Sequence, residues 1–462
     1  MRHMDSSSFS TVNPATEEQI ETFSFFSAQE TDAALARAEK SFRSYRKLSV
    51  HQRAQLLSRL ATTLRKNKAC LAKVITMEMG KILREAEAEV EKCAWEADWY
   101  AEHGPQMFAD APAATGRVEA YISYLPLGPI LGIMPWNFPL WQATRMGIPT
   151  LLAGNPVLVK HSPNTQRSSL ELERMMLESG FPEGVFQNLI LKTEDIVNVI
   201  NDARVQGASV TGSVRAGSAV ASEAGKVIKK TVMELGGSDA FIVLEDADIP
   251  RAVAAGIKGR FSNAGQICLA AKRFILVEKI ADAFEEEFVK AAQAIRVGDP
   301  TDPANQMGPM ARADLRDSLH KQVERSIAAG ARVLCGGKPE DGKGAFYLPT
   351  VLSGVTQGMA AFDEEMFGPV ATITRVADVD AAVDAANASE FGLSGNVWTR
   401  DIELARRMAR DLYTGGVFIN GVTSSDPRVP VGGVKNSGYG RELSYFGAHA
   451  FVNAQTVWIE SL

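Results

Sequence analysis

The chain has 462 residues, 45% of them hydrophobic and 23% charged, and its 49 Lys and Arg against 55 Asp and Glu give a net charge of −6. These proportions are ordinary for a folded globular protein and argue against the disordered, collagen-like and coiled-coil classes. The length suggests about three domain-sized units, and the slightly acidic balance disfavours a broad nucleic-acid-binding surface or a polybasic membrane patch.

Four cysteines occur without the CxxC spacing of a zinc site or the density of a disulfide framework: Cys70, Cys93, Cys268 and Cys335. We therefore expect no metal and a reducing, cytoplasmic location. Residues 1–10 are polar and lack the apolar stretch of a secretion signal, and four prolines interrupt the longest apolar stretch, Leu125 to Trp141. No segment is expected to span a bilayer, and no membrane partner is expected.

From Thr31 to Tyr100, apolar residues recur every three or four positions, which predicts a helical layer. Ser49 and Gln52 have the spacing of a helix capping box. Between Arg117 and Tyr124 the apolar residues alternate, which predicts a strand with one buried face. We interpret this strand as an edge that is able to pair with another chain.

The pattern then changes to short apolar runs separated by helical segments. The runs are Ile130 to Met134, Val157 to Val159, Phe186 to Leu191, Ala208 to Thr211, Val232 to Leu235 and Phe241 to Leu244. This alternation predicts right-handed βαβ units and a parallel sheet. Ligands of such sheets bind at the carboxyl ends of the strands, so the functional residues are expected directly after these runs.

A second α/β region is predicted after Phe274. Its signals are a helix from about Ala281 to Ile295, a Gly- and Pro-rich loop from Gly298 to Pro309, and strands near 370–374 and 417–420. The segment Thr456 to Ile459 is typical of a short strand and is interpreted as an added strand near the C-terminus.

Cys268 follows Asn263-Ala264-Gly265-Gln266-Ile267, where small residues would let a substrate approach the thiol closely. A nucleophile and a buried, inert cysteine are both consistent with this context alone. The other three cysteines are interpreted as inert.

The loop Gly212 to Gly217 follows one predicted strand and opens a helix, so its N–H groups could face a phosphate. Its spacing is not GxGxxG, and a tight turn is an equally good interpretation. Glu234 precedes a Gly-Gly pair at a strand end, where a carboxylate could act as a general base or as an ion-pair partner.

Taken together, these segments resemble the NAD(P)-dependent aldehyde dehydrogenase superfamily along nearly the whole chain. The matching motifs, in order, are Pro135-Trp136-Asn137-Phe138-Pro139, Val159-Lys160, Thr211-Gly212-Ser213 with Gly217, Glu234-Leu235-Gly236-Gly237, Gly265-Gln266-Ile267-Cys268, Glu365-Met366-Phe367-Gly368-Pro369 and 430–438. The resemblance implies an α/β fold with a Rossmann-like cofactor domain, an α/β catalytic domain and a small β element for oligomerisation. The expected division is 1–110 with 127–236 for the cofactor domain, 237–435 for the catalytic domain, and 111–126 with 436–462 for the oligomerisation element.

The resemblance also implies the roles of the catalytic residues. Cys268 is the nucleophile, the Asn137 amide and the Cys268 N–H stabilise the oxyanion, and Glu234 is the base that deacylates the thioester. For the cofactor it implies contacts with Trp136, Lys160, Ser162, Pro163, Thr211, Gly212, Ser213, Gly217, Leu235, Glu365 and Phe367.

Cofactor choice depends on the position three residues after Lys160, where strictly NAD-preferring relatives often carry a glutamate that repels a 2′-phosphate. Here it is Pro163. We expect NAD with some use of NADP.

The expected substrate is succinate semialdehyde, because Arg145 matches an arginine that succinate semialdehyde dehydrogenases use for the distant carboxylate. The alternative is that Arg145 pairs with an acid of the chain itself. The second arginine of that site is replaced by Ser262, and Ser425 or Arg428 could complete the site. Lys160 to Asn164 and Arg441 to Ser444 resemble the shorter bacterial branch of these enzymes, which is the reason for preferring it to glutarate semialdehyde, aliphatic or broad-range dehydrogenases.

A coenzyme A-acylating enzyme and a catalytically silent structural protein are the two other functions that this resemblance allows. A coenzyme A-acylating relative would generally lack Glu234, and a catalytically silent structural protein would not need Asn137, Glu234 and Cys268 together. The expected partner is a small aldehyde, with no nucleic acid, and the expected assembly is a homodimer or homotetramer.

Overall fold

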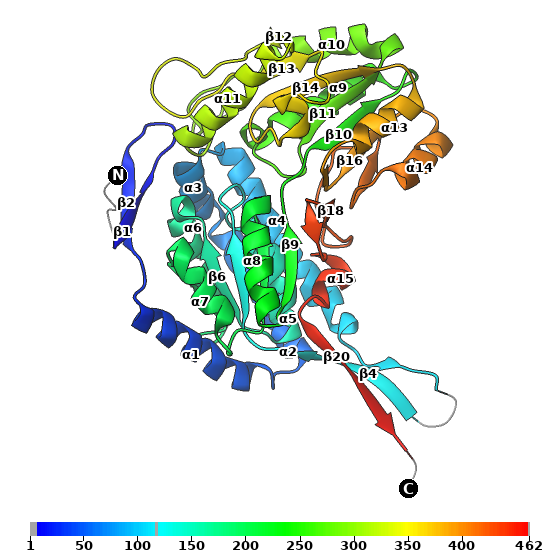
Figure 1. The fold of residues 1–462 in the computed structure, drawn as a ribbon. Coiled ribbons are helices and arrows are strands. Elements are labelled where there is room, and N and C mark those ends of the chain that lie inside the picture. Colours follow the sequence, from blue (N-terminus) through cyan, green and yellow to red (C-terminus); the bar gives the residue numbers. More distant parts are fainter. Residues whose placement is uncertain (1–6, 116–118, 461–462) are drawn as a thin grey trace.

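The computed structural model describes residues 7–115 and 119–460, and Figure 1 shows their arrangement. Arg117 and Val118, at the start of the predicted edge strand, lie outside the described residues, as do Met1 to Ser6 of the polar start. No helix in the described ranges combines the length and the apolar character needed to cross a membrane.

A helical layer follows an N-terminal hairpin. The hairpin pairs β1 (Ser8–Val12) with β2 (Gln19–Ser24), and the helices are α1 (Ala28–Tyr45), α2 (Val50–Lys66), α3 (Lys68–Met79) and α4 (Leu83–Met107). The predicted capping box is confirmed, because the Ser49 hydroxyl accepts from the Gln52 N–H and the Gln52 side chain accepts from the Ser49 N–H. The hairpin was not predicted, since most of its side chains are exposed or half-buried and carry no apolar alternation.

The first large sheet has six strands in the order β19-β9-β8-β5-β6-β7, all parallel except β19. Its strands are β5 (Ile130–Met134), β6 (Val157–His161), β7 (Phe186–Asn188), β8 (Gly207–Thr211), β9 (Lys230–Glu234) and β19 (Gly438–Tyr439). The connecting helices are α5 (Trp141–Ala153), α6 (Gln166–Glu178), α7 (Ile196–Asn201) and α8 (Val214–Lys226). One large apolar core lies between this sheet and helices α2 to α4.

The second large sheet has seven strands in the order β12-β13-β14-β11-β10-β16-β17. They are β10 (Asp239–Val243), β11 (Ala271–Val277), β12 (Arg332–Cys335), β13 (Thr350–Ser353), β14 (Val370–Val376), β16 (Gly395–Trp398) and β17 (Val417–Ile419). The helices around it are α9 (Ile249–Phe261), α10 (Glu278–Gln293), α11 (Ala313–Ala328), α12 (Ala360–Asp363), α13 (Val379–Asn387) and α14 (Ile402–Asp411). Two apolar cores involve this sheet, one centred on phenylalanines of β10, β11 and α10 and the other on residues of β10, β16, α13 and α14.

A third sheet extends away from the body as an arm (Figure 1). It is formed by β3 (Ala111–Pro112), β4 (Glu119–Pro126) and β20 (Val452–Ile459), with β4 antiparallel to both neighbours. The short helix α15 (Ser444–Ala448) precedes β20, and β15 (Phe391–Gly392) pairs with β18 (Val434–Lys435) nearby. The predicted strand near Thr456 is confirmed and is longer than expected.

The predicted α/β class, the parallel sheet and the second α/β region after Phe274 are confirmed. The run Phe241 to Leu244 was expected with the first sheet but forms β10 of the second, in which β12 is antiparallel to β13. One predicted run was too long, because Phe186 to Leu191 contributes only the three residues of β7 before the chain leaves the sheet. β19, from the segment expected to form the oligomerisation element, pairs with β9 of the six-stranded sheet. The domain boundaries themselves stay a prediction.

Candidate active site

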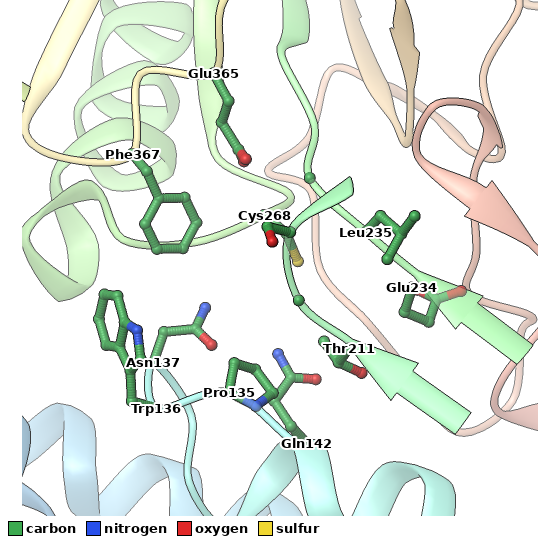
Figure 2. Close-up of a pocket in the computed structure, with 13 residues that line it drawn as sticks. Pro135, Trp136, Asn137, Gln142, Thr211, Glu234, Leu235, Cys268, Glu365 and Phe367 are labelled. Atoms are coloured by element: carbon green, nitrogen blue, oxygen red, sulfur yellow. The ribbon is translucent and has the colours of Figure 1, made fainter. Parts of the chain in front are cut away.

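A cavity of about 350 Å³ lies where the two large sheets meet (Figure 2). Its walls come from the carboxyl ends of β5, β8 and β9, the first turn of α5, and the segments that precede β11 and β14. The lining residues are Pro135, Trp136, Asn137, Gln142, Thr211, Gly212, Ser213, Glu234, Leu235, Gly236, Cys268, Glu365 and Phe367.

The sheet order explains why the cavity forms at this point. From β5 the chain continues on one side to β6 and β7, then crosses β5 to form β8 and β9 on the other side. The loops after β5 and β8 therefore diverge and leave a crevice between them, as at the switch point of other open α/β sheets. Pro135 to Asn137 and Thr211 to Ser213 line opposite sides of this crevice.

Cys268 is presented by a strained turn. Asn263, Ala264 and Gly265, in the 3₁₀ segment η3 (Ser262–Gly265), have φ values of 52°, 50° and 71°. Left-handed backbone at two consecutive residues other than glycine costs free energy and persists only where neighbours hold it in place. The Gln266 side chain does so, since its Oε1 accepts from the Ala311 N–H at 2.9 Å and its Nε2 donates to the Asn263 carbonyl at 3.1 Å.

Two buried cations fix the backbone around the nucleophile. The Arg260 Nη2 donates to the Gly368 carbonyl at 2.6 Å and also to the Gly265 carbonyl, which connects the Cys268 turn to the segment that carries Glu365. Lys272 donates to the Cys268 carbonyl at 2.7 Å and lies 3.2 Å from the Glu365 carboxylate. These contacts fix the position of the Cys268 turn relative to the Glu365 carboxylate.

The Cys268 thiol is protonated at neutral pH in this structure. Burial raises the pKa of Cys268 to about 11, although the positive charges of Arg145 and Lys272 oppose the rise. A thiolate therefore has to be produced by proton transfer to a base during the reaction.

Donors for an oxyanion surround the sulfur. Asn137 is buried, and its Nδ2 donates one hydrogen to the Gln266 carbonyl at 2.9 Å. The Asn263 amide donates to the Asn137 carbonyl at 2.9 Å and so fixes the Asn137 backbone. Among the described residues, the Cys268 N–H has no acceptor. The second Asn137 amide hydrogen and the Cys268 N–H are therefore free for a developing negative charge.

Glu234 lines the same cavity at the end of β9, but Figure 2 shows its carboxylate turned away from the Cys268 sulfur. The Glu234 Oε1 packs against Gly432, where an added Cβ would lie 2.7 Å from it. This oxygen has no hydrogen-bond partner among the described residues. Burial raises the pKa of Glu234 to about 8, despite the opposing charge of Arg145. A carboxyl group with this pKa suits taking a proton from water near neutral pH.

Arg145 is paired with acids of the chain itself. Its Nε donates to Glu442, and its Nη2 lies 3.7 Å from the Glu234 carboxylate and 3.3 Å from the Thr211 hydroxyl. Arg145 is 1% exposed and is not among the residues that line the cavity. This arrangement matches the alternative interpretation of Arg145, and its contact with a substrate carboxylate stays a prediction.

The dinucleotide side of the cavity has the features that such a ligand needs. Ser213 caps α8 by accepting from the Ala216 N–H at 3.3 Å, and the free N–H groups of the first turn of the helix are available to a phosphate. A Cβ at Gly217 would lie 2.5 Å from the Leu235 side chain. The absence of a side chain at this position therefore lets α8 pack closely on the sheet. Trp136 and Phe367 meet edge to face, with ring centroids 5.7 Å apart.

Lys160, at the end of β6, is 8% exposed and has no carboxylate within ion-pair distance among the described residues. Burial lowers the pKa of its ammonium group. An unpaired lysine of this kind fits a ribose hydroxyl or a phosphate oxygen. Ser162 donates to the Asn164 side chain at 2.6 Å, and Pro163 opens the 3₁₀ segment η1 (Pro163–Thr165).

The two serines predicted for the substrate are already engaged. The Ser262 hydroxyl hydrogen-bonds the half-buried Glu85 carboxylate. Ser425 is buried, and its Oγ accepts from the Lys92 ammonium at 2.7 Å. Neither serine lines the cavity around Cys268, and their contact with substrate stays a prediction.

Sequence reasoning missed four residues of this region: Gln142, Arg260, Lys272 and Glu442. Glu442 lies within a stretch that the sequence comparison had singled out, and Gln142 lies one helical turn before Arg145, so both could have been considered. Arg260 and Lys272 flank the nucleophile but bond backbone carbonyls, which no residue pattern indicates. No cluster of His, Cys, Asp and Glu able to hold a metal occurs in the described ranges.

The aldehyde dehydrogenase family model matches residues 2–457. The chain belongs to the aldehyde dehydrogenase family. It is 51% identical to the NAD(P)+-dependent succinate semialdehyde dehydrogenase Sad of Escherichia coli K12, over 97% of each chain. It is 49% identical to the NADP+-dependent succinate semialdehyde dehydrogenase of Mycolicibacterium paratuberculosis, over 98% of this chain and 96% of the relative.

Solved structures of the family confirm the aldehyde dehydrogenase fold. The succinic semialdehyde dehydrogenase of Streptococcus pyogenes, solved with NADP+, superimposes with a TM-score of 0.96 and 37% identity. The match covers 98% of this chain and 100% of that one.

Replacing Arg145 with Met is expected to lower the free energy of unfolding by about 3–5 kcal/mol, because Glu442 and Glu234 would be left buried without a counter-charge. Chemical denaturation measures this loss. The same variant should reduce kcat/KM for a carboxylate-bearing aldehyde and for an uncharged one by similar factors.

Arg145→Lys keeps the positive charge and should recover part of both losses. A loss confined to the carboxylate-bearing aldehyde would instead show that Arg145 contacts substrate.

Proposed function

We propose that this aldehyde dehydrogenase oxidises succinate semialdehyde to succinate with NAD(P)+. The observation that carries the proposal is the meeting of Cys268, Asn137 and Glu234 around one cavity whose other wall is the N-terminus of α8. Relatives that are about 50% identical over nearly the full chain are named succinate semialdehyde dehydrogenases, which supports this choice of substrate.

The first half of the reaction follows from the oxyanion site. The Cys268 thiol gives its proton to solvent water, and its sulfur then bonds to the aldehyde carbon. As the C=O π bond opens, the oxygen becomes an anion that the Asn137 amide and the Cys268 N–H stabilise. Removing one such donor typically costs about 10²- to 10³-fold in rate. The dinucleotide, when bound, accepts the hydride that leaves this carbon. The carbon is thereby oxidised to a thioester on Cys268.

The second half releases the acid. Glu234 takes a proton from water, the water oxygen bonds to the thioester carbon, and the bond from carbon to the Cys268 sulfur breaks. The products are succinate and the free cysteine. The Glu234 carboxylate is the base form, so this step needs a pH near or above the pKa of Glu234, which is about 8.

For the cofactor we propose NAD with use of NADP. The residues fit a dinucleotide, because the first turn of α8 offers N–H groups and Lys160 offers a buried cation without an acidic partner. Pro163 takes the place of the acid that would repel a 2′-phosphate. Relatives named for NADP+ and for NAD(P)+ support use of both.

We also propose a homodimer or homotetramer in which the β3-β4-β20 arm pairs with another copy. The arm extends from the body, and Trp458 and Ile459 on it are 50% and 45% exposed. A reducing, cytoplasmic location is proposed as well, because Cys268 has to remain a free thiol.

The deciding experiment measures cofactor reduction with succinate semialdehyde, glutarate semialdehyde and butanal, each with NAD and with NADP. The proposal expects kcat/KM for succinate semialdehyde to exceed that for butanal by roughly tenfold or more, equivalent to about 1.4 kcal/mol of carboxylate recognition. Equal values would make the enzyme a broad-range dehydrogenase, and a preference for the longer semialdehyde would reassign the substrate.

A further inference from the structure

We propose that Lys92, together with Ser425, binds the distant carboxylate of the substrate. This inference rests on the proposed function and names the group that recognises the acid end of the semialdehyde. It assigns that recognition to a residue of α4, a helix that bears no catalytic or cofactor residue identified from the sequence.

Helix α4 runs along the start of α5, which forms one wall of the cavity. Glu89 on α4 accepts from the N–H groups of Leu140 and Trp141 at 2.9 and 3.0 Å, which fixes α4 against the first turn of α5. Almost one helical turn further along α4, the Lys92 ammonium lies 4.3 Å from the centre of the Trp141 ring. Gln142, the next residue of α5, lines the cavity beside Cys268. Lys92 is therefore close to the wall of the reaction cavity.

Lys92 is a half-buried cation that forms no ion pair within the described residues. Among the described residues, no carboxylate lies within 4.0 Å of its ammonium, and its one hydrogen bond goes to the Ser425 hydroxyl at 2.7 Å. Two other lysines of this helical layer are paired with acids: Lys81 with Glu89, and Lys68 with Glu91. Holding a charge away from water without a close partner costs free energy. An anionic ligand bound at Lys92 would offset part of this cost.

The neighbouring cations are not available for this task. Arg145 is held by Glu442 and Glu234, and Arg428 is held by Asp426 through two hydrogen bonds of 2.8 and 2.6 Å. Unlike these two arginines, Lys92 has no ion-pair partner in the described part of the chain.

The surroundings of Lys92 also suit a short dicarboxylate chain. The Trp141 face offers an apolar surface to the methylene groups, and the Ser425 hydroxyl can donate to a carboxylate oxygen once Lys92 turns to the ligand. The Gln142 Oε1 is buried and has no hydrogen-bond partner within residues 7–115 and 119–460, so the side-chain amide of Gln142 is free to reorient towards a substrate.

Lys92→Met tests the inference, because Met keeps an apolar stem against Trp141 and removes only the charge. The wild-type protein is measured first with succinate semialdehyde and butanal. In the variant, kcat/KM for the semialdehyde is expected to fall by about 10- to 100-fold, as for the loss of a charged hydrogen bond, while that for butanal stays within about twofold.

Two further variants separate recognition from folding. Lys92→Arg keeps the charge and should retain most of the preference for the semialdehyde. Lys68→Met removes a lysine that contacts α4 through Glu91 and should leave both substrates unchanged. Thermal unfolding of all three variants shows whether any loss comes from instability.

The outcomes distinguish the two proposals. A wild-type protein that does not prefer the semialdehyde overturns the proposed substrate. A wild-type preference that survives intact in Lys92→Met, or a Lys92→Met loss that is equal for both aldehydes, overturns the role of Lys92 alone.

The pH dependence gives an independent readout. Burial and the positive charge of Arg145 lower the pKa of Lys92 to about 8. The other titratable groups that face Lys92 are Glu89, Cys93 and Glu96 on α4 and Asp426 in the loop with Ser425, and burial raises the pKa of Cys93 and that of Glu96 well above their usual range. The ammonium form binds a carboxylate and disappears as pH rises through 8. The ratio of kcat/KM for semialdehyde to that for butanal should therefore fall between pH 7 and 9.5, and a flat ratio would contradict the assignment.

Discussion

The Cys268→Ala protein is expected to bind the dinucleotide but to reduce none of it, with any aldehyde. Without the sulfur no covalent adduct forms, and hydride has no tetrahedral carbon to leave. The loss should be about 10⁴-fold or more, as for the removal of other enzyme nucleophiles. Cofactor reduction, followed by absorbance, measures it. Intact-protein mass spectrometry should at the same time show no acyl adduct.

Cys70→Ala is the matched control, because Cys70 is exposed and far in the sequence from the cavity residues. It should keep full activity. Substantial turnover by the Cys268→Ala protein would remove Cys268 as the nucleophile, and a comparable loss in the Cys70→Ala protein would point to a general effect on folding.

Glu234→Gln should separate the two halves of the reaction. Acylation leaves a rapid burst of reduced cofactor close to one per active site, after which the steady state slows by about 10²-fold or more, because no carboxylate activates the water. Stopped-flow absorbance measures the burst. The acyl enzyme that accumulates should appear on Cys268 by mass spectrometry, and an unchanged steady-state rate would show that another group deacylates the enzyme.

The pH profile of the wild-type protein also tests whether Glu234 is the base that deacylates the enzyme. The pKa of Glu234 is raised to about 8, so its carboxylate is scarce at pH 6 and abundant at pH 9. The steady-state rate should therefore rise with pH across this interval. In the Glu234→Gln variant that rise should flatten, since glutamine does not titrate there.

The sequence could predict the reacting groups because each lies in a compact local motif. Asn137 and Glu234 occupy short segments at the carboxyl ends of β5 and β9, and the alternation of apolar runs and helices placed those ends at one edge of the sheet. Cys268 lies in the turn before β11, and its role followed from the family motif around it. The six-stranded sheet and the helical layer were predictable for the same reason, since buried periodicity is a local property of the sequence.

The pairing of charges was not predictable in this way. Arg145 and Glu442 are 297 positions apart, and Lys92 and Ser425 are 333 apart. Whether an arginine faces a substrate or an internal acid depends on which distant segment folds against it. The left-handed backbone at Asn263 and Ala264 is also invisible in the sequence, because tertiary contacts of Gln266 hold it.

The distance in sequence between Arg145 and Glu442 also has a consequence for synthesis on the ribosome. At about 5–20 residues per second, the nascent chain carries Arg145 for roughly 15–60 s before Glu442 is made. During that time the helix α5 can form, but it cannot bury its arginine beside a partner. The cofactor sheet is therefore expected to reach its final packing only after the second sheet has been synthesised, and a translating intermediate would expose this helix to chaperones.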